Sequence, residues 1–271
     1  MAKNKLRLDV LLVQKGMVES REKAKALIMA GKVFQENMRL DKPGMPVNDD
    51  LNIIIKGELH PYVSRGGLKL AKAIDVFQMD LKGKVIADIG ASTGGFTDCA
   101  LQNGAKKVYA IDVGYGQLDW RLRSDERVEC LERTNARFLN EQSLPEKVDM
   151  VVCDVSFISL TKLFTAIMAI LKPEGDTLIL IKPQFEAGPE NVGKNGVVRD
   201  PQIHQQVLES VLQEAEKYLF TVRGLNYSPI RGPEGNIEFL AWLKKGLPEQ
   251  QGIDWLSEVP MLVRQAQKEA E

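Results

Sequence analysis

VIADIGASTGGFT, residues 85–97, is the stretch that decides the fold of this 271-residue chain. Its first five residues predict a buried strand, and a helix pattern begins at about Gly95. The glycines between them let the backbone turn sharply and let a nucleoside approach the strand end. The next predicted strand, Lys107–Asp112, ends in a carboxylate that can accept hydrogen bonds from both ribose hydroxyls. This stretch therefore predicts a nucleoside-binding turn at the edge of a sheet.

The residues of this turn favour one class of cofactor. A dinucleotide-binding loop reads G-x-G-x-x-G, whose glycines let a pyrophosphate dock on the helix N-terminus. Here Ala91 and Ser92 stand where the second glycine belongs, and Asp88 lies inside the strand. Such loops resemble S-adenosylmethionine sites, which bind no phosphate; a nicotinamide cofactor is the alternative, because it would use the same acidic position. The candidate cofactor-binding residues are Asp88, Gly90, Ser92, Gly94, Gly95, Phe96, Asp112, Asn135 and Asp154.

Strands alternate with helical patterns through most of the chain. Helical periodicity is strongest at Leu160–Leu171 and Ile203–Tyr218. Buried strands that alternate with helices predict an α/β fold with a doubly wound, mostly parallel sheet. The last two strands have no long helix between them, so we expect them to pair as an antiparallel hairpin. The predicted strands are residues 85–89, 107–112, 128–131, 150–154, 177–181, 220–225 and 239–243.

Composition and charge exclude several classes of protein. The chain is 44% hydrophobic and 27% charged, which is ordinary for a globular protein. Three scattered cysteines and two distant histidines predict neither a disulfide scaffold nor a metal site, and a cytoplasmic location fits. No signal-like stretch follows the N-terminus, and the longest apolar run, around Leu163–Leu171, is about half a membrane span, so we expect no membrane contact.

The N-terminal segment is basic and has a different pattern of elements. Residues 1–72 hold 14 Lys and Arg against 8 Asp and Glu, whereas the remainder holds 22 against 29. A basic end on an acidic body suggests a module that faces a polyanion. Two helices, the second capped by Ser20 and buried through Ala24, Ala26, Leu27 and Ile28, precede short strands at 32–34 and 51–55.

Three short motifs in this segment resemble a known RNA-binding domain. Arg7-Leu8-Asp9, residues 20–24 and residues 28–33 are similar to the domain named after the fourth small-subunit ribosomal protein. Basic side chains near a helix N-terminus suit contacts to RNA phosphates. The alternative is that Arg21 and Lys25 only pair with Glu22 and Glu19 on the helix surface. The candidate RNA-binding residues are Arg7, Arg21, Lys23, Lys25, Lys32 and Arg65.

Four charged residues lie at predicted strand ends or beside them. Lys69 precedes the first strand of the sheet, Asp154 ends the fourth, Lys182 follows the fifth and Glu238 begins the last. Parallel strands bring such positions to one edge. Together with the cofactor turn, these residues resemble the catalytic tetrad of the FtsJ-like RNA 2′-O-methyltransferases. With the N-terminal module, nearly the whole chain resembles the TlyA family, which is often labelled haemolysin A.

This resemblance implies a fold, a division into domains and an activity. The fold is a Rossmann-like, seven-stranded class I S-adenosylmethionine-dependent methyltransferase at 69–271, joined by a linker at 61–68 to a small α+β RNA-binding domain at 1–60. The activity is 2′-O-ribose methylation of ribosomal RNA, typically at cytidine, with free RNA or ribosomal subunits as the partner. A haemolysin-like membrane-active protein and an RNA-binding scaffold with an inactive methyltransferase fold are the alternatives. Oligomeric state is not predicted.

The chemistry of the four residues can be argued separately. A ribose 2′-hydroxyl is a poor acid, so methyl transfer needs a base close to the oxygen. We predict that Lys182 is this base, and that Lys69 supplies a neighbouring positive charge that stabilises the developing alkoxide. Asp154 and Glu238 would orient the lysines and the hydroxyl. Each residue alone could equally form a surface salt bridge.

Overall fold

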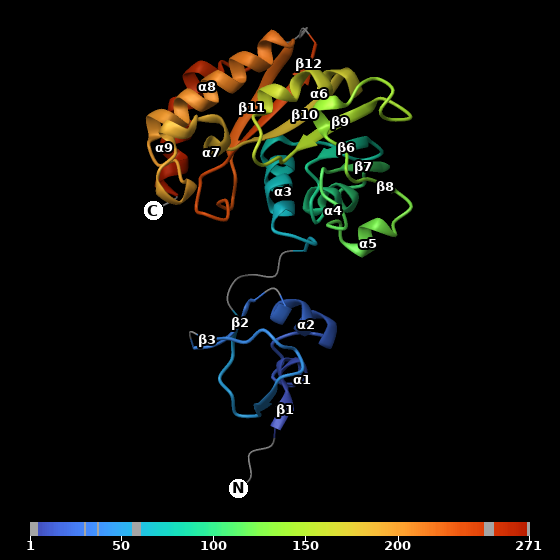
Figure 1. Cartoon of the computed structure of the whole chain (residues 1–271), viewed down its shortest axis with the longest axis vertical. Helices are drawn as coiled ribbons and strands as arrows, with labels where there is room; N and C mark the ends of the chain where they lie inside the picture. The colour runs from blue at the N-terminus through green and yellow to red at the C-terminus, as the bar shows by residue number, and fades with distance from the viewer. Residues whose placement is uncertain (1–4, 30, 37, 56–60, 247–251, 270–271) are drawn as a thin grey trace. The chain divides into compact units, whose positions relative to one another are not determined.

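The computed structural model describes residues 5–29, 31–36, 38–55, 61–246 and 252–269, and its backbone contacts divide the chain into two units, residues 1–59 and 60–271 (Figure 1). Each unit has its own hydrophobic core. Residues 56–60, at the predicted end of the RNA-binding domain, lie outside the described residues. The predicted linker at 61–68 is partly wrong, because helix α3 (Gly66–Phe77) already begins within it.

The N-terminal unit packs two helices with short strands. Strand β1 pairs antiparallel with β4, and β2 pairs antiparallel with both β3 and β5. The core gathers Leu8, Leu12, Leu27 and Ile28, each at most 1% exposed. The expected burial of Ala26 is wrong, because this residue lies on the exposed face of its helix. The elements are β1 (Lys5–Arg7), α1 (Leu8–Gln14), α2 (Arg21–Met29), β2 (Val33–Gln35), β3 (Met38–Arg39), β4 (Pro46–Asn48) and β5 (Ile54–Ile55).

The larger unit is built on a seven-stranded sheet with the order β11-β12-β10-β9-β6-β7-β8. The pairs among β10, β9, β6, β7 and β8 are parallel, and β12 is antiparallel to both of its neighbours, β10 and β11. The predicted α/β fold and the predicted final hairpin are therefore confirmed. The strands are β6 (Val85–Ile89), β7 (Lys107–Ile111), β8 (Val128–Leu131), β9 (Val148–Cys153), β10 (Leu171–Ile181), β11 (Phe220–Tyr227) and β12 (Phe239–Lys245).

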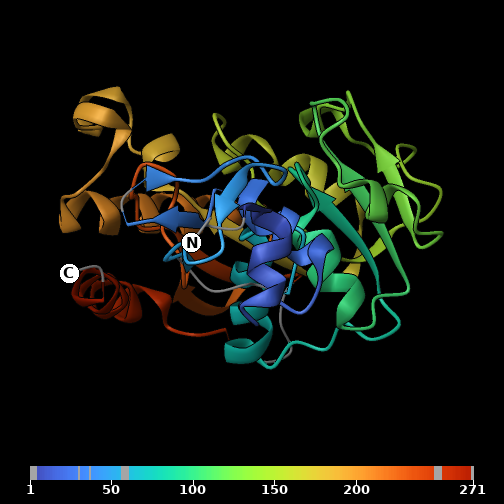
Figure 2. The same ribbon diagram turned by 90° about the horizontal axis from the view of Figure 1, so that it is seen from below.

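Helices cover both faces of this sheet. Helices α6 (Phe164–Ile170), α8 (Pro201–Lys217) and α9 (Trp255–Lys268) share one core cluster, while α3 and α4 (Gly95–Gln102) share the other. Alternate residues of β6 enter the two clusters, as the period of a strand requires. Helices α8 and α9 pack against each other and against β11 (Figures 1 and 2).

Two helical predictions need correction. The pattern at 160–171 forms a 3₁₀ turn at Leu160–Lys162 and then α6, whereas Leu171 already begins β10. Helix α9 was not predicted, because Pro260 lies inside it and masks its periodicity. Its buried face is nevertheless regular, since Val259, Val263 and Ala266 enter the core. Short helices α5 (Trp120–Arg123) and α7 (Pro183–Glu186) follow β7 and β10.

Candidate active site

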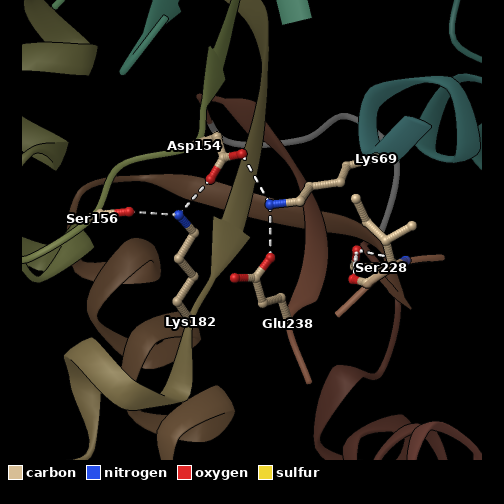
Figure 3. A network of polar contacts seen from close by, with 7 residues as sticks. Lys69, Asp154, Ser156, Lys182, Ser228 and Glu238 are labelled. Carbon is tan, nitrogen blue, oxygen red and sulfur yellow. Dashed lines mark hydrogen bonds and ion pairs between the residues drawn. The ribbon is translucent and has the colours of Figure 1, made fainter. Parts of the chain in front are cut away.

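The structure brings the four predicted charged residues together in one cluster of ion pairs (Figure 3). Asp154 lies between the two lysines: its Oδ2 is 3.1 Å from Lys69 Nζ and its Oδ1 is 2.6 Å from Lys182 Nζ. Lys69 Nζ also lies 2.7 Å from Glu238 Oε2. The side chains are between 2% and 16% exposed. A surface salt bridge is therefore not the right description of any of them.

Sheet register explains why these residues meet. Strands β9 and β10 are parallel neighbours, so Asp154 and Lys182, which directly follow them, emerge at the same edge. Ile181 of β10 is opposite Phe239 of β12, which places Glu238 beside Lys182 at that edge. Lys69 enters from the first turn of α3. The backbone of Glu238 is fixed because its carbonyl accepts a hydrogen bond of 2.8 Å from the amide of Ser228.

The electrostatics of the cluster hold Lys69 as an ammonium ion. Burial disfavours its charge most strongly, yet Asp154 and Glu238 together outweigh this effect and raise the pKa of Lys69. Burial likewise opposes the charge of Asp154, but the two lysines lower the pKa of its carboxyl below the ordinary value. The cluster therefore holds a positive charge at Lys69. The predicted stabilisation of an alkoxide by Lys69 would need such a charge.

A cavity of about 370 Å³ lies beside the cluster at the ends of β6 and β7. Its polar lining includes Ser92, Asp112, Asn135 and Asp154, all of them predicted cofactor residues. Apolar side chains, among them Ile111, form other parts of the wall. A largely apolar cavity with a few convergent polar groups is typical of small-molecule sites.

The backbone of the glycine turn forms the floor of this cavity. Gly90 has φ +83°, and a Cβ atom there would lie 2.7 Å from the carbonyl oxygen of Asp154. Only glycine avoids both the strain and the collision. The carboxylate of Asp112 accepts hydrogen bonds from the backbone amides of Ser92, at 2.8 Å, and Gly114, at 2.7 Å. These bonds fix the acid at the cavity, where its remaining lone pairs can accept ribose hydroxyls.

Asp88 differs from the other predicted cofactor residues. Its side chain is fully buried, lines neither this cavity nor the one described next, and accepts a hydrogen bond of 2.6 Å from Thr97 Oγ1 of α4. Burial is the main reason that the pKa of Asp88 rises to about 7. Gly94 is also a packing position, because a Cβ atom there would meet the side chains of Leu118 and Leu122.

A second cavity, of about 280 Å³, adjoins the charged cluster. Lys69 and Lys182 line it, together with Gly95 and Phe96 of the glycine turn. Four residues line both cavities, and they mark the junction between the two spaces: Gly90, Ser92, Asp154 and Ser156. A molecule in the first cavity and a second molecule in the other would therefore meet beside Asp154.

The predicted RNA-binding residues fall into two groups. Arg65 directly precedes α3, makes no side-chain capping hydrogen bond to it, and lines the second cavity. The others belong to the N-terminal unit: Arg7, Arg21, Lys23 and Lys25 are exposed, and Lys32 is half-buried. Arg21 pairs with Asp9, at 3.1 Å, which differs from the alternative of a pair with Glu22 or Glu19 on the helix surface. Lys23 pairs with Glu19.

Three further residues of the site are not among the candidate site residues predicted from the sequence. Ser156 accepts a hydrogen bond of 3.0 Å from Lys182 Nζ (Figure 3). Phe157 is 91% exposed, has φ +62° and packs against Phe185 with ring centroids 5.0 Å apart. Arg231 lines the second cavity. Their sequence signal was position: two lie two and three positions after Asp154, and the third lies in a glycine-rich segment.

Comparisons with known proteins agree with this geometry. Residues 62–245 match the model of the FtsJ-like methyltransferase family, and residues 6–53 match that of the S4 domain. The chain is 43% identical to the 16S/23S rRNA (cytidine-2′-O)-methyltransferase TlyA of Mycobacterium tuberculosis, over 88% of this chain and 89% of that one. The chain belongs to the TlyA family of FtsJ-like methyltransferases. The methyl donor of this family, S-adenosylmethionine, is therefore the cofactor.

Two further relatives cover nine tenths or more of the chain. Protein YqxC of Bacillus subtilis, named as a candidate rRNA methyltransferase, is 52% identical over 90% of this chain and 87% of that one. A solved structure from Streptococcus thermophilus, named as a candidate haemolysin, has 47% identity and a TM-score of 0.78, and covers 99% of this chain and 98% of that one. Both the methyltransferase name and the haemolysin name therefore occur among the relatives.

Within the described ranges, no helix combines the length and the apolar character that crossing a bilayer requires. In this same part of the chain, no three His, Cys, Asp or Glu side chains are grouped so that they could hold a metal ion.

Proposed function

We propose that this protein transfers a methyl group from S-adenosylmethionine to the 2′-oxygen of a cytidine ribose in ribosomal RNA. The observation that carries the proposal is the buried cluster of two lysines and two carboxylates at the junction of two cavities. One cavity suits a nucleoside, and the other opens toward basic side chains. The names of the relatives support ribosomal RNA as the substrate and cytidine as the nucleotide.

The first cavity has the donor set that S-adenosylmethionine needs. Asp112 would accept the ribose hydroxyls, and Asn135 and the apolar side chains near Ile111 would surround the adenine. The glycine turn from Gly90 leaves room for the rest of the cofactor, and Asp154 would lie near its sulfonium charge. When bound, the cofactor supplies an electrophilic methyl group. The residues present therefore fit the cofactor.

The second cavity would hold the acceptor ribose. We assign proton removal from the 2′-hydroxyl to Lys182 Nζ, which reaches this cavity and is oriented by Asp154 and Ser156. Lys69, an ammonium ion held by Asp154 and Glu238, would stabilise the negative charge that develops on the oxygen. Holding the 2′-oxygen beside the first cavity would supply much of the remaining rate enhancement of methyl transfer.

RNA would be held by basic and aromatic groups outside the cluster. Arg65 and Arg231 line the acceptor cavity and can reach phosphates. The exposed ring of Phe157, beside the cofactor cavity, offers a face on which an unstacked base can pack. The N-terminal unit would add phosphate contacts through Arg7 and Arg21. The cytoplasm, where ribosomes are made, is the proposed location.

Methyl transfer to ribosomal RNA tests the proposal directly. Purified protein is incubated with labelled S-adenosylmethionine and either free ribosomal RNA or ribosomal subunits, and the RNA is digested and analysed for 2′-O-methylcytidine by mass spectrometry. We expect this nucleoside to appear, and ribose-methylation mapping to lose a matching position in cells that lack the protein. Label in a base, or no transfer at all while calorimetry detects cofactor binding, would contradict the proposed reaction.

The same preparation separates the two alternatives. A membrane-active protein would lyse erythrocytes, and the Lys182→Ala variant would lyse them equally well, because membrane lysis needs no methyl transfer. A scaffold with an inactive fold would bind RNA without binding the cofactor. The intact charged cluster and the cofactor cavity argue against the scaffold.

A further inference from the structure

One carboxylate in the N-terminal unit is buried among basic groups. Asp9 lies in the first turn of α1 and is 0% exposed, although its domain is basic. Arg7 donates to it twice, from Nε to Oδ1 and from NH2 to Oδ2, each at 3.0 Å. Arg21, at the start of α2, donates from NH2 to Oδ2 at 3.1 Å. A single buried acid thus holds two arginines from two different elements.

The two arginines remain accessible while they are held. Their side chains are 51% and 50% exposed, whereas that of Asp9 is 0% exposed. The Arg7 guanidinium is also confined from another side, because a Cβ atom at Gly44 would lie 3.2 Å from its NH1. The hydrogen bond from Arg7 is the main reason that the pKa of the Asp9 carboxyl lies well below its usual range. The acid is therefore an anion at any pH at which the protein works.

From this arrangement we infer that Asp9 is a positioning residue for RNA binding. It fixes the guanidinium groups of Arg7 and Arg21 as a pair that faces solvent and can receive RNA phosphates. Arginine side chains lose much conformational freedom when they bind a phosphate, and prior fixation removes part of this cost from the binding step. The inference rests on the proposed RNA substrate.

If net charge alone decided RNA affinity, removal of Asp9 would have the opposite effect. Binding to RNA is strengthened by positive charge near the phosphates, because bound counterions are released. Removal of a carboxylate from this unit makes the surface more positive and should tighten binding if net charge decides. Removal of a carboxylate that orients two arginines should weaken RNA binding, although the net charge of the unit becomes more positive. The sign of the change therefore separates the two explanations.

A matched pair of variants provides the test. Asp9→Asn and Glu19→Gln each remove one negative charge from the N-terminal unit, but Glu19 is exposed and its ion pair is with Lys23. Ribosomal RNA binding by the full chain is measured by fluorescence anisotropy over a range of salt concentrations. We expect Asp9→Asn to weaken binding by about tenfold. We expect Glu19→Gln to leave binding unchanged or slightly tighter.

A second variant covers the case in which Asp9→Asn disturbs folding. Arg7→Lys keeps the positive charge but cannot make the two-pronged contact with Asp9, so it should also weaken RNA binding. Circular dichroism and the thermal unfolding of each variant report the fold. Cofactor affinity, which belongs to the other unit, should stay at the wild-type value.

The outcomes distinguish a failure of the positioning role of Asp9 from a failure of the proposed RNA substrate. Binding by Asp9→Asn that equals or exceeds that of Glu19→Gln, in folded protein, overturns the positioning role. If Asp9→Asn does not fold, the deciding variant is Arg7→Lys. An RNA affinity of Arg7→Lys equal to that of the wild-type protein then overturns the positioning role. Failure of the wild-type protein to bind ribosomal RNA at any salt concentration overturns the proposed substrate as well.

Discussion

Replacing Asp154 by asparagine removes the carboxylate that the two buried lysines of the active site share. Lys69 keeps an ion-pair partner in this variant, because Glu238 Oε2 lies 2.7 Å from its Nζ. Lys182 keeps the hydroxyl of Ser156, at 3.0 Å, and the ring of Phe185, whose centroid is 5.8 Å from its Nζ, and its side chain is 8% exposed. Lys182 is thus left without its carboxylate partner, and methyl transfer should be lost together with stability.

The expected decrease in the free energy of unfolding follows from this loss of a partner. Removal of one member of a buried ion pair costs about 3–5 kcal/mol, because the other charge stays buried and unpaired. If Lys182 is also replaced by methionine, no unpaired charge remains. The double variant Asp154→Asn/Lys182→Met should therefore regain about 2 kcal/mol relative to the sum of the two single variants. Activity should not return, because the proposed base is absent.

Urea unfolding followed by tryptophan fluorescence measures these free energies. Glu141→Gln is the control, because Glu141 pairs with Lys147 at the surface and its loss should change the free energy of unfolding little. The reasoning is refuted if Asp154→Asn is no less stable than this control. It is also refuted if the effects of the two single variants simply add in the double variant.

Three further predictions concern the turn, the strand and the acceptor cavity. The folded-state pKa of Asp88, about 7, exceeds its ordinary 3.8, so the stability it contributes is present at low pH and is lost as pH rises to 7. The free energy of unfolding should fall by about 4 kcal/mol over this window, and the same titration of Asp88→Asn should lack that slope. Gly90→Ala should weaken cofactor binding in calorimetry at least tenfold, because its Cβ atom would lie 2.7 Å from a backbone oxygen. Gly83→Ala, with φ +72° and nothing within 4 Å, should bind normally, and equal losses would contradict the steric argument. Arg231→Gln should raise the KM for RNA and reduce the salt slope of binding by about one. Arg223→Gln, which only loses a contact with the ring of Trp242, should change neither quantity, and an unchanged KM in Arg231→Gln would remove Arg231 from the RNA site.

The sequence predicted the sheet and the charged cluster because both depend on local patterns. A strand that ends in glycine and the alternation of strands with helices specify a parallel sheet, and a parallel sheet gathers the residues at its strand ends. Lys182 and Asp154 could be found in this way. Lys69 had a weaker signal, because it only precedes the first strand of the sheet, and α3 begins inside the segment that was expected to be a linker.

Features that depend on tertiary packing could not be predicted. The burial of Asp88 against Thr97 follows from how α4 crosses β6, and the strand pattern alone does not show which acid faces a cavity. The hydrogen bond between Lys182 and Ser156 joins two loops. In the N-terminal unit, the partner of Arg21 is Asp9, twelve positions away, rather than a neighbour on its own helix.

Single-turnover methyl transfer by Lys182→Ala tests the central claim most directly. The variant is saturated with S-adenosylmethionine and ribosomal RNA, and calorimetry measures its cofactor affinity separately. Lys172→Ala, which removes a surface partner of Asp149, is the control. We predict that Lys182→Ala loses at least about a hundredfold in rate, as removal of a general base does, while its cofactor affinity stays near that of the control. A rate equal to that of Lys172→Ala would contradict the assignment of Lys182 as the base.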